Sequence, residues 1–382
     1  MQTTPDLHQT RIQSIDFVRG LVMVLMAIDH VRVYSGLPAG GPEPGIFFTR
    51  WVTHFCAPAF VFLSGASAYL YGLKLSPKEL TKYLVTRGFL LIVLELTVIR
   101  FFWTFNLDYA KFTLAGVIWM LGWCMILLGL VVRFNAKTVG IVGLVIVFFQ
   151  NVFALVPKLL PESARPSFGR FWEFIYSSGL EGPSWINILY VIVPWIGVMA
   201  AGYGFGMILQ LKEDRTKILL RIGLAATICF IVFGTAQIFA ASSTDGPPFI
   251  FKLLSQRKYP ASPLFLLMTL GPTILLMPFV EKSHNFIARA LKMVGRVPFF
   301  YYLLHILLIH ISALVVVAVR EGSLITEWYG TAPYAWVPEE HRWSLGLLYL
   351  VFIIDVIVLY FSCRWYEGYK FTHRENKWLK FI

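Results

Sequence analysis

The chain has 382 residues, of which 57% are hydrophobic and only 14% are charged, and its formal net charge is +12. Average soluble domains carry about 25% charged residues, so this composition excludes an ordinary soluble protein and indicates a polytopic membrane protein. The positive charge is then expected in cytoplasmic loops, not in a nucleic-acid-binding surface. The four cysteines stand alone in apolar runs, and the eight histidines show neither HxxxH nor HExxH spacing. We therefore expect neither a disulfide framework nor a metal site.

Apolar runs separated by polar loops predict an all-α integral membrane protein with about ten transmembrane helices. The predicted spans are 14–34, 46–72, 83–104, 112–132, 138–157, 185–211, 218–241, 261–280, 297–319 and 344–363. We expect residues 1–10 to be a disordered segment, 11–363 a single transmembrane domain and 364–382 a basic cytoplasmic tail. The first span is too long and too charged for a cleaved signal peptide.

The loop charges predict the orientation of this bundle. Lys and Arg are roughly twice as frequent on the side of the N-terminus as on the other side, and the side richer in Lys and Arg is normally cytoplasmic. Both termini are therefore expected in the cytoplasm, with the chain in the plasma (bacterial inner) membrane. A short interfacial helix is expected near 168–176, and the oligomeric state is left open.

The first span carries ionisable residues in its apolar run, namely Asp16, Arg19, Asp29, His30 and Arg32. A charge at the bilayer centre costs about 2.5–3.5 kcal/mol, so such residues indicate a functional site. Arg19 and His30 are separated by eleven positions, which places them within roughly 20° on a helix and about 16 Å apart along it. One face of this helix then presents a cation towards one leaflet and an imidazole towards the other.

Three stretches resemble a known superfamily of membrane acyltransferases. RIQSIDFVRGLVMVLMAIDH (11–30) is similar to the opening span of bacterial domains related to heparan-α-glucosaminide N-acetyltransferase, and its Arg19-x10-His30 spacing is that of the polysaccharide O-acyltransferases. APAFVFLSGASAYLYG (57–72) resembles the second span of the same families. GRVPFFYYLLHILLIH (295–310), together with KYPASPLFLLMTLGP (258–272), resembles the bacterial branch of the N-acetyltransferase-like family.

The resemblance implies transfer of an acetyl or other short acyl group across a membrane. The donor is acyl-CoA, with acetyl-CoA expected, and it comes from the cytoplasm; the acceptor is commonly a sugar on the other side, or another small molecule. One position departs from the N-acetyltransferase pattern, which has Asn in place of His30 and its catalytic His about eleven residues later. The corresponding region, 39–44, contains no His. His30 or His54 must then serve as the base, and an amine and a hydroxyl both remain open as the acceptor group.

The candidate catalytic residues are therefore His30, Asp29 and His54. A general base needs a pKa near the working pH, and a neighbouring carboxylate can raise the pKa of a histidine and hold its ring in place. Adjacent helix positions diverge by about 100°, so Asp29 can contact another helix instead. Both residues can also simply end the span near water. For His54 a packing role is the alternative.

The candidate donor-binding residues are Arg19, Asp16, His305 and Tyr302. A guanidinium suits phosphate oxygens, so Arg19 can hold CoA. Its alternative is an ion pair with Asp16, three positions away on the same face. The resemblance through 295–310 implies that His305, with Tyr302, lines the active-site cavity, whereas His310 is expected to be structural.

The remaining features are expected to have structural roles. Glu95 and Arg100 lie about 140° apart on one helix, so each is expected to find an ionic partner on another span. The small-residue run at 64–68 and GYGFG at 202–206 predict close helix packing. The basic loops around 212–221 and 282–296 are expected to be topology signals. A transporter or channel remains the alternative function, although we find no matched halves of the kind typical of transporters.

Overall fold

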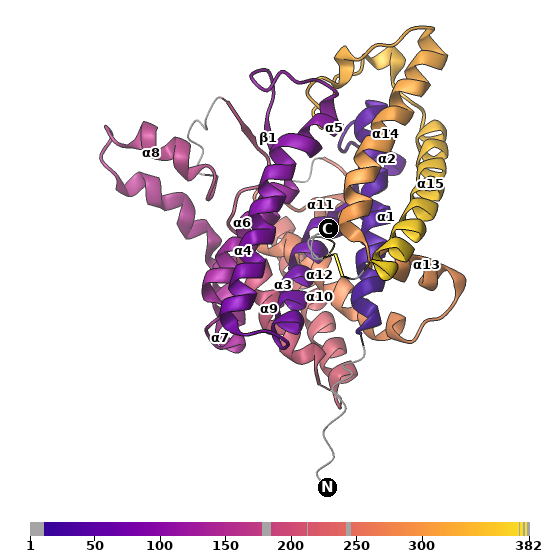
Figure 1. Ribbon diagram of the computed structural model, residues 1–382. Helices are drawn as coiled ribbons and strands as arrows, with labels where there is room; N and C mark the ends of the chain where they lie inside the picture. Colours follow the sequence, from indigo (N-terminus) through magenta and orange to yellow (C-terminus); the bar gives the residue numbers. More distant parts are fainter. Residues whose placement is uncertain are drawn as a thin grey trace.

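The computed structural model describes residues 11–177, 185–211, 213–241, 246–373, 375, 376 and 379. The predicted disordered segment 1–10, Lys212 of the first basic loop and most of the tail beyond 373 lie outside the described residues. The described chain folds as a bundle of helices, with α14 and α15 side by side along one edge and α4, α6 and α7 towards the other (Figure 1).

Each of the ten predicted ranges contains a helix or a helical series. These are α1 (Gln13–Ser35), α2–η1–α3 (Pro44–Trp51, Val52–Phe55, Cys56–Gly72), α4–η2–α5 (Pro77–Leu94, Glu95–Ile99, Arg100–Thr104), α6 (Val117–Val131), α7–η3 (Ala136–Phe149, Gln150–Leu159), α9 (Trp195–Leu209), α10 (Arg215–Ala240), α12 (Pro263–Glu281), α14 (Pro298–Glu321) and α15 (Leu345–Thr372). Shorter helices are α8 (Arg165–Trp172), α11 (Phe249–Leu254), α13 (Phe286–Val294), η4 (Glu327–Tyr329) and η5 (Glu339–His341).

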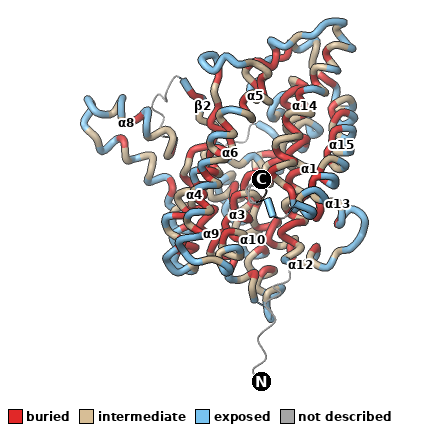
Figure 2. The backbone as a smooth tube through the Cα atoms, in the orientation of Figure 1, coloured by how far each residue is buried: buried red, intermediate tan, exposed pale blue. Residues whose placement is uncertain are grey.

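Within the described residues, six of these helices or helical series are long and apolar enough to cross a membrane. They begin at residues 44, 136, 215, 263, 298 and 345, and α6 and α9 are shorter apolar helices. Buried segments gather in the middle of the bundle, while the loops at its ends are largely exposed (Figure 2). Exposed Ile, Leu, Val and Phe side chains cover the outer faces of α7, α10 and α15. The protein is therefore an integral membrane protein.

Helix ends follow local capping chemistry. Ser76, Ser262 and Ser344 each accept a hydrogen bond from the backbone N–H three residues further on, at the starts of α4, α12 and α15. Such caps satisfy N–H groups that have no partner inside the helix. At the ends of α1 and α14, Gly36 (φ 75°) and Gly322 (φ 70°) adopt the left-handed conformation that glycine allows without steric cost.

Small residues bring helices into backbone contact, as predicted. A Cβ built at Gly65 of α3 would lie 2.0 Å from the Met199 carbonyl oxygen of α9, and one at Gly202 of α9 would lie 2.0 Å from that of Phe62. Without a hydrophobic force between helices in lipid, such close van der Waals contact is what holds them together. Both predicted motifs therefore act in packing between α3 and α9.

Two predicted span boundaries are wrong because short strands interrupt the helices. The pair β1 (Leu114–Ala115) and β2 (Asn187–Ile188) is parallel, and α6 and α9 begin only after it. The backbone N–H and C=O groups of β1 and β2 thus bond to each other. At membrane depth, a non-helical segment needs such partners because lipid offers none. The all-α class holds apart from this pair.

The last helix is longer than the last predicted span. Helix α15 continues to Thr372, nine residues beyond the predicted end of the last span at 363. Part of the expected tail is therefore helical. The cause is local, because Tyr366 packs face to face on Phe300 with ring centroids 4.1 Å apart, so this end of α15 is held against α14.

Helix α1 lies inside the bundle and organises it. It contacts α3, α12, α13, α14 and α15, and most of its residues are buried. A helix surrounded on so many sides cannot expose its ionisable residues to lipid. Asp16, Arg19, Asp29 and His30 must therefore find partners or a cavity inside the protein.

Candidate active site

A cavity of about 820 Å³ runs beside α1 for the whole length of that helix. Its lining begins at Arg11 and Arg19, continues past Met23, Met26 and His30, and ends at Leu37 and Pro38. Residues of α3, α4, α6 and α14 complete the walls. Since α1 has 23 residues and rises 1.5 Å for each, the cavity extends over about 35 Å, comparable to a hydrocarbon core.

One end of the cavity, which we call the basic mouth, is lined by cations. They are Arg11, Arg19, Arg87, Arg296 and Lys370. Arg11 donates to Asp16 at 2.5 Å, and Arg296 donates to Glu367 at 2.8 Å. Burial acts to lower the pKa of Arg11, but the hydrogen bond and charge of Asp16 outweigh it, so this pKa is raised and the guanidinium stays charged.

Arg19 has no carboxylate partner among the ion pairs of the described residues. It donates to Ser67 Oγ at 2.6 Å and to the Leu63 carbonyl at 3.2 Å, both on α3. The alternative Arg19–Asp16 pair is thus not formed, since Asp16 binds Arg11 and approaches Arg296 at 3.9 Å. Arg87 likewise donates to a hydroxyl, that of Tyr83, at 2.7 Å. Two guanidinium groups in this mouth therefore keep charge that no carboxylate in the described chain neutralises directly.

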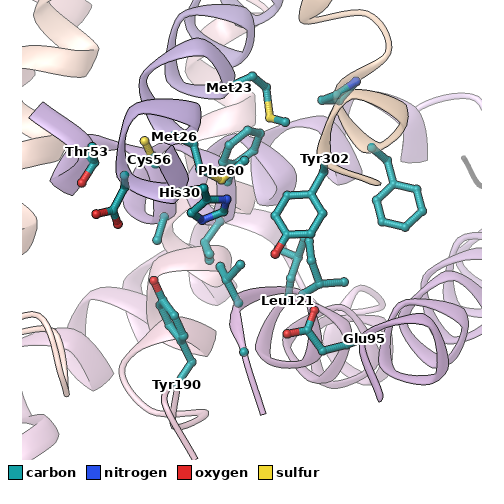
Figure 3. A pocket seen from close by; sticks show the side chains of 18 of the residues that line it. Met23, Met26, His30, Thr53, Cys56, Phe60, Glu95, Leu121, Tyr190 and Tyr302 are labelled. Carbon is teal, nitrogen blue, oxygen red and sulfur yellow. The ribbon is translucent and has the colours of Figure 1, made fainter. Parts of the chain in front are cut away.

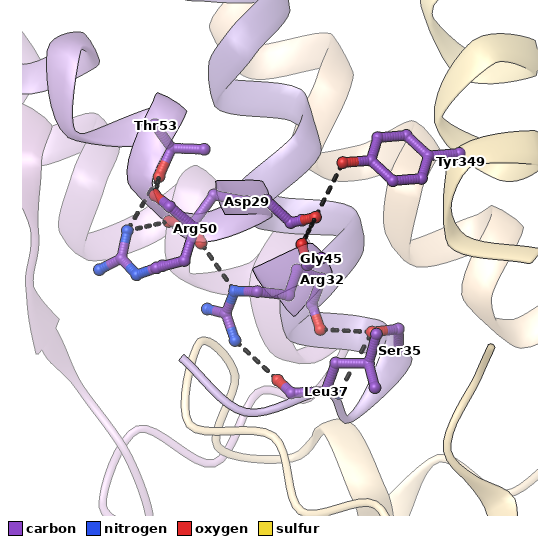
Figure 4. A network of polar contacts seen from close by, with 9 residues as sticks. Asp29, Arg32, Ser35, Leu37, Gly45, Arg50, Thr53 and Tyr349 are labelled. Atoms are coloured by element: carbon purple, nitrogen blue, oxygen red, sulfur yellow. Dashed lines mark hydrogen bonds and ion pairs between the residues drawn. The ribbon is translucent and has the colours of Figure 1, made fainter. Parts of the chain in front are cut away.

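The other end, which we call the loop mouth, is formed by segments that connect helices, together with Arg50 of α2. Its residues are Leu37, Pro38, Arg50, Tyr190, Lys258, Tyr259 and Tyr334. Asp29 lies here and accepts from Arg32 and from Arg50, each at 2.9 Å (Figure 4). Arg50 also donates to Thr53 Oγ1 at 3.0 Å. Asp29 therefore connects α1 to α2, which is the contact with another helix that the sequence left open. Its contacts include no direct bond to His30.

His30 is hydrogen-bonded to His305 of α14, with 2.7 Å between His30 Nδ1 and His305 Nε2. The Nδ1 of His305 is 3.1 Å from the Tyr301 carbonyl oxygen, which can only accept, so this nitrogen carries a proton. His305 is fully buried and has no carboxylate partner among the described residues, so a neutral ring is favoured. Its Nε2 is then an acceptor, His30 Nδ1 is the donor, and His30 Nε2 keeps a free lone pair.

The middle of the cavity is largely apolar, and three polar side chains extend into it. Met23, Met26, Phe60 and Leu121 line it, and Figure 3 shows His30, Tyr302 and Glu95 pointing into the same space. Glu95 belongs to the π-helical turn η2, accepts from the Gly116 backbone N–H and has an unbonded Oε2. A π-helical turn often marks a functional position because it redirects one side chain.

Glu95 and Arg100 do not pair with charged residues of other spans, contrary to the prediction. Glu95 forms no ion pair in the part of the chain that the structure describes. Arg100 instead donates to backbone carbonyls of the following loop, those of Asn106, Asp108 and Phe112. A guanidinium has five N–H donors, so several carbonyls of a folded loop can satisfy it without a carboxylate.

His54 and His310 lie apart from this arrangement. His54 lines a second pocket, of about 760 Å³, between α2 and the 246–257 segment. Its buried Nδ1 has no hydrogen-bond partner among the described residues. His310 is buried, its Nδ1 lies 2.9 Å from the Phe102 carbonyl oxygen, and its ring stacks on Phe105 with centroids 3.8 Å apart. Because the carbonyl only accepts, His310 Nδ1 is the donor, consistent with the structural role expected for it.

Sequence reasoning missed several cavity residues. Arg87 falls inside the predicted span 83–104, and an ionisable residue in an apolar run was the signal that could have identified it. Arg50 carried the same signal, because it falls inside the predicted span 46–72. Tyr190 falls inside the predicted span 185–211, where aromatic residues are common, and Lys258 precedes the span 261–280, where a charge is ordinary, so the sequence carried no comparable signal for these two.

The fold and the cavity together define a helical integral membrane protein with a charged internal site that follows its central helix. The family described as heparan-alpha-glucosaminide N-acetyltransferase, catalytic, matches residues 11–239. The chain belongs to this family of membrane acyltransferases. The match includes Arg19, Asp29, His30, His54 and Glu95 but ends before α12–α15. A comparison with curated proteins gives no match.

Proposed function

We propose that this protein moves an acetyl or other short acyl group from cytoplasmic acyl-CoA to a sugar amine or hydroxyl on the opposite side of the membrane. The observation that carries the proposal is the single cavity that Arg19 and His30 both line. We further propose that all ten helices cross the membrane with both termini in the cytoplasm, as the loop charges favour. The basic mouth then faces the cytoplasm.

The basic mouth suits the phosphate groups of acyl-CoA. Arg19 and Arg87 are the proposed contacts, because neither is neutralised by a carboxylate in the described structure. Guanidinium groups bind phosphate oxygens through two parallel hydrogen bonds. Asp16 acts indirectly, by holding Arg11 and Arg296 beside them. The largely apolar middle of the cavity suits the pantetheine arm, which places the thioester near Tyr302 and His30.

His30 is the proposed general base. Its free Nε2 lone pair takes the proton from the acceptor amine or hydroxyl as the nucleophile attacks the thioester carbonyl carbon. The carbon–sulfur bond then breaks, the acyl group remains on the acceptor, and the CoA sulfur leaves with a proton. Asp29 supports this end of α1 through Arg32 and Arg50, and its contacts favour a structural over a direct catalytic role. His54, in its separate pocket, is not used.

The test is acetyl-CoA turnover by the purified protein in detergent, followed as thiol release with and without glucosamine. His30→Ala should lower kcat about 10²- to 10⁴-fold, the usual contribution of a general base, and leave CoA binding unchanged in calorimetry. His284→Ala is the matched control, since His284 is exposed. Full turnover by His30→Ala would refute the assigned base. Solute flux into liposomes without CoA, together with absent turnover, would favour a transporter.

A further inference from the structure

Lys258 is a buried cation at the loop mouth, and no carboxylate of the described residues forms an ion pair with it. It is 9% exposed, lines the cavity, and forms no ion pair or side-chain hydrogen bond in the described chain. Its Nζ lies 5.3 Å from the ring centre of Tyr259 and 6.0 Å from that of Tyr190. Aromatic faces attract an ammonium group, but they do not neutralise its charge.

The backbone holds Lys258 at this position. Its neighbours form a turn in which Lys258 pairs with Ala261 and the Arg257 carbonyl accepts from the Ser262 N–H at 2.9 Å. Ser262 then caps α12. Lys258 is therefore anchored to the start of a helix, and its side chain extends from an ordered segment into the cavity.

The loop mouth as a whole is positively charged. Asp29 accepts hydrogen bonds from both Arg32 and Arg50, so one carboxylate faces two guanidinium groups. Lys258 adds a further positive charge to this excess. The charge of Lys258 also reaches Asp29 and His30. Arg50 uses only Nη1 for its bonds to Asp29 and Thr53, and its guanidinium also approaches Tyr259.

Tyr259 lies in the same positive field, beside Lys258 and Arg50. Desolvation acts to raise the pKa of this phenol, but Lys258, Arg50 and the hydrogen bond to Tyr190 outweigh it and leave the pKa below the ordinary value. Tyr190 packs edge-on against Tyr259, with ring centroids 5.2 Å apart. Two tyrosines beside a lysine and an arginine offer aromatic faces together with hydrogen-bond donors. Pockets that orient a ligand commonly combine these groups.

We propose that Lys258 and Arg50 form a subsite for an oxyanion, and that the acyl acceptor is a sugar carrying a carboxylate or phosphate group. An anion there supplies the missing counterion, which a buried ammonium requires. The subsite lies at the same end of the cavity as His30, so a bound oxyanion would orient the amine or hydroxyl towards the base. The proposal rests on the proposed acyltransferase function. Lys258 lies beyond the residues that match the family, 11–239.

Calorimetry on the full-length protein tests the subsite without requiring turnover. The protein is first saturated with CoA, so that sugar phosphates cannot occupy the basic mouth. Glucosamine 6-phosphate, glucuronate and glucosamine are then titrated separately, which distinguishes a phosphate from a carboxylate and from no oxyanion. The variants are Lys258→Gln, Lys258→Arg and, as the control, Lys111→Gln, because Lys111 is exposed on a loop and absent from the cavity lining.

The wild type should bind at least one oxyanion sugar more tightly than glucosamine. Lys258→Gln should weaken that binding about 10- to 100-fold, as loss of a charge-assisted hydrogen bond does, and leave glucosamine unaffected. Lys258→Arg and Lys111→Gln should resemble the wild type. Equal affinity of the wild type for all three sugars, no binding of any of them, or an equal loss for all three in Lys258→Gln would overturn the subsite.

These outcomes separate the two proposals. Oxyanion-selective binding that depends on Lys258, in a protein that transfers no acetyl group, would retain the subsite and refute the acyltransferase function. If the protein transfers acetyl groups to glucosamine but Lys258→Gln does not selectively weaken binding of the oxyanion sugars, the acyltransferase function is retained and the subsite is refuted. Melting temperatures of the variants show whether each is folded.

Discussion

Replacement of His305 tests how the catalytic geometry is held. In His305→Leu the Nδ1–H of His30 loses its acceptor, which is 2.7 Å away in the structure. A buried donor left without a partner costs about 1–3 kcal/mol, and each 1.36 kcal/mol is a factor of ten in rate. If this cost is felt in the transition state, kcat falls about 5- to 150-fold. The KM for acetyl-CoA should stay constant, because the phosphates bind at the basic mouth.

His305→Gln is the informative partner variant. A glutamine side chain places an amide oxygen near the former Nε2, so it can still accept from His30 and should keep kcat within a few-fold of the wild type. The assay is thiol release from acetyl-CoA, with CoA affinity and melting temperature measured for every variant. Equal losses in the Leu and Gln variants, or a raised KM at unchanged kcat, would show that His305 does not act by accepting this hydrogen bond.

Three further substitutions probe the donor site and the packing. Arg87→Gln should weaken CoA binding about 10- to 100-fold in calorimetry, because a charge-assisted hydrogen bond to phosphate is lost; unchanged affinity would exclude Arg87 from the donor site. Gly202→Ala should lower the melting temperature, since its Cβ would lie 2.0 Å from the Phe62 carbonyl oxygen; an unchanged value would mean that α3 and α9 separate freely. Ser76→Ala removes the capping box with Glu79 and should cost about 1 kcal/mol of stability, which thermal unfolding would detect.

Matched controls exist for each of these changes. Lys82→Gln removes an exposed cation from the same helix as Arg87 and should leave CoA affinity unchanged. Gly368→Ala places a Cβ where no heavy atom lies within 4 Å, so it should be neutral or slightly stabilising. For Ser76, a Thr variant retains the hydroxyl and should recover most of the stability. A Thr variant as unstable as the Ala variant would exclude the cap as the cause.

Much of the architecture follows from periodicity and composition alone. The ten helical ranges could be predicted because lipid exposure demands long apolar runs, and the backbone must satisfy its own hydrogen bonds inside them. The shared cavity face of Arg19 and His30 could be predicted because helix geometry relates residues eleven positions apart without any tertiary information. Close packing at Gly202 could be predicted for the same local reason, since only small side chains allow backbones to touch.

The partners of the buried polar groups depend on the tertiary structure. His30 forms a hydrogen bond with His305, which is 275 positions away in the sequence. Asp29 pairs with Arg50 as well as with Arg32 of its own helix. Asp16 binds Arg11 and not Arg19. Several donors lie within reach of each acceptor along one helix, so spacing alone cannot choose among them. The pairing of donors and acceptors is determined by the packing of α3, α13 and α14 around α1. Only this packing decides which buried charges contact one another and which face the cavity.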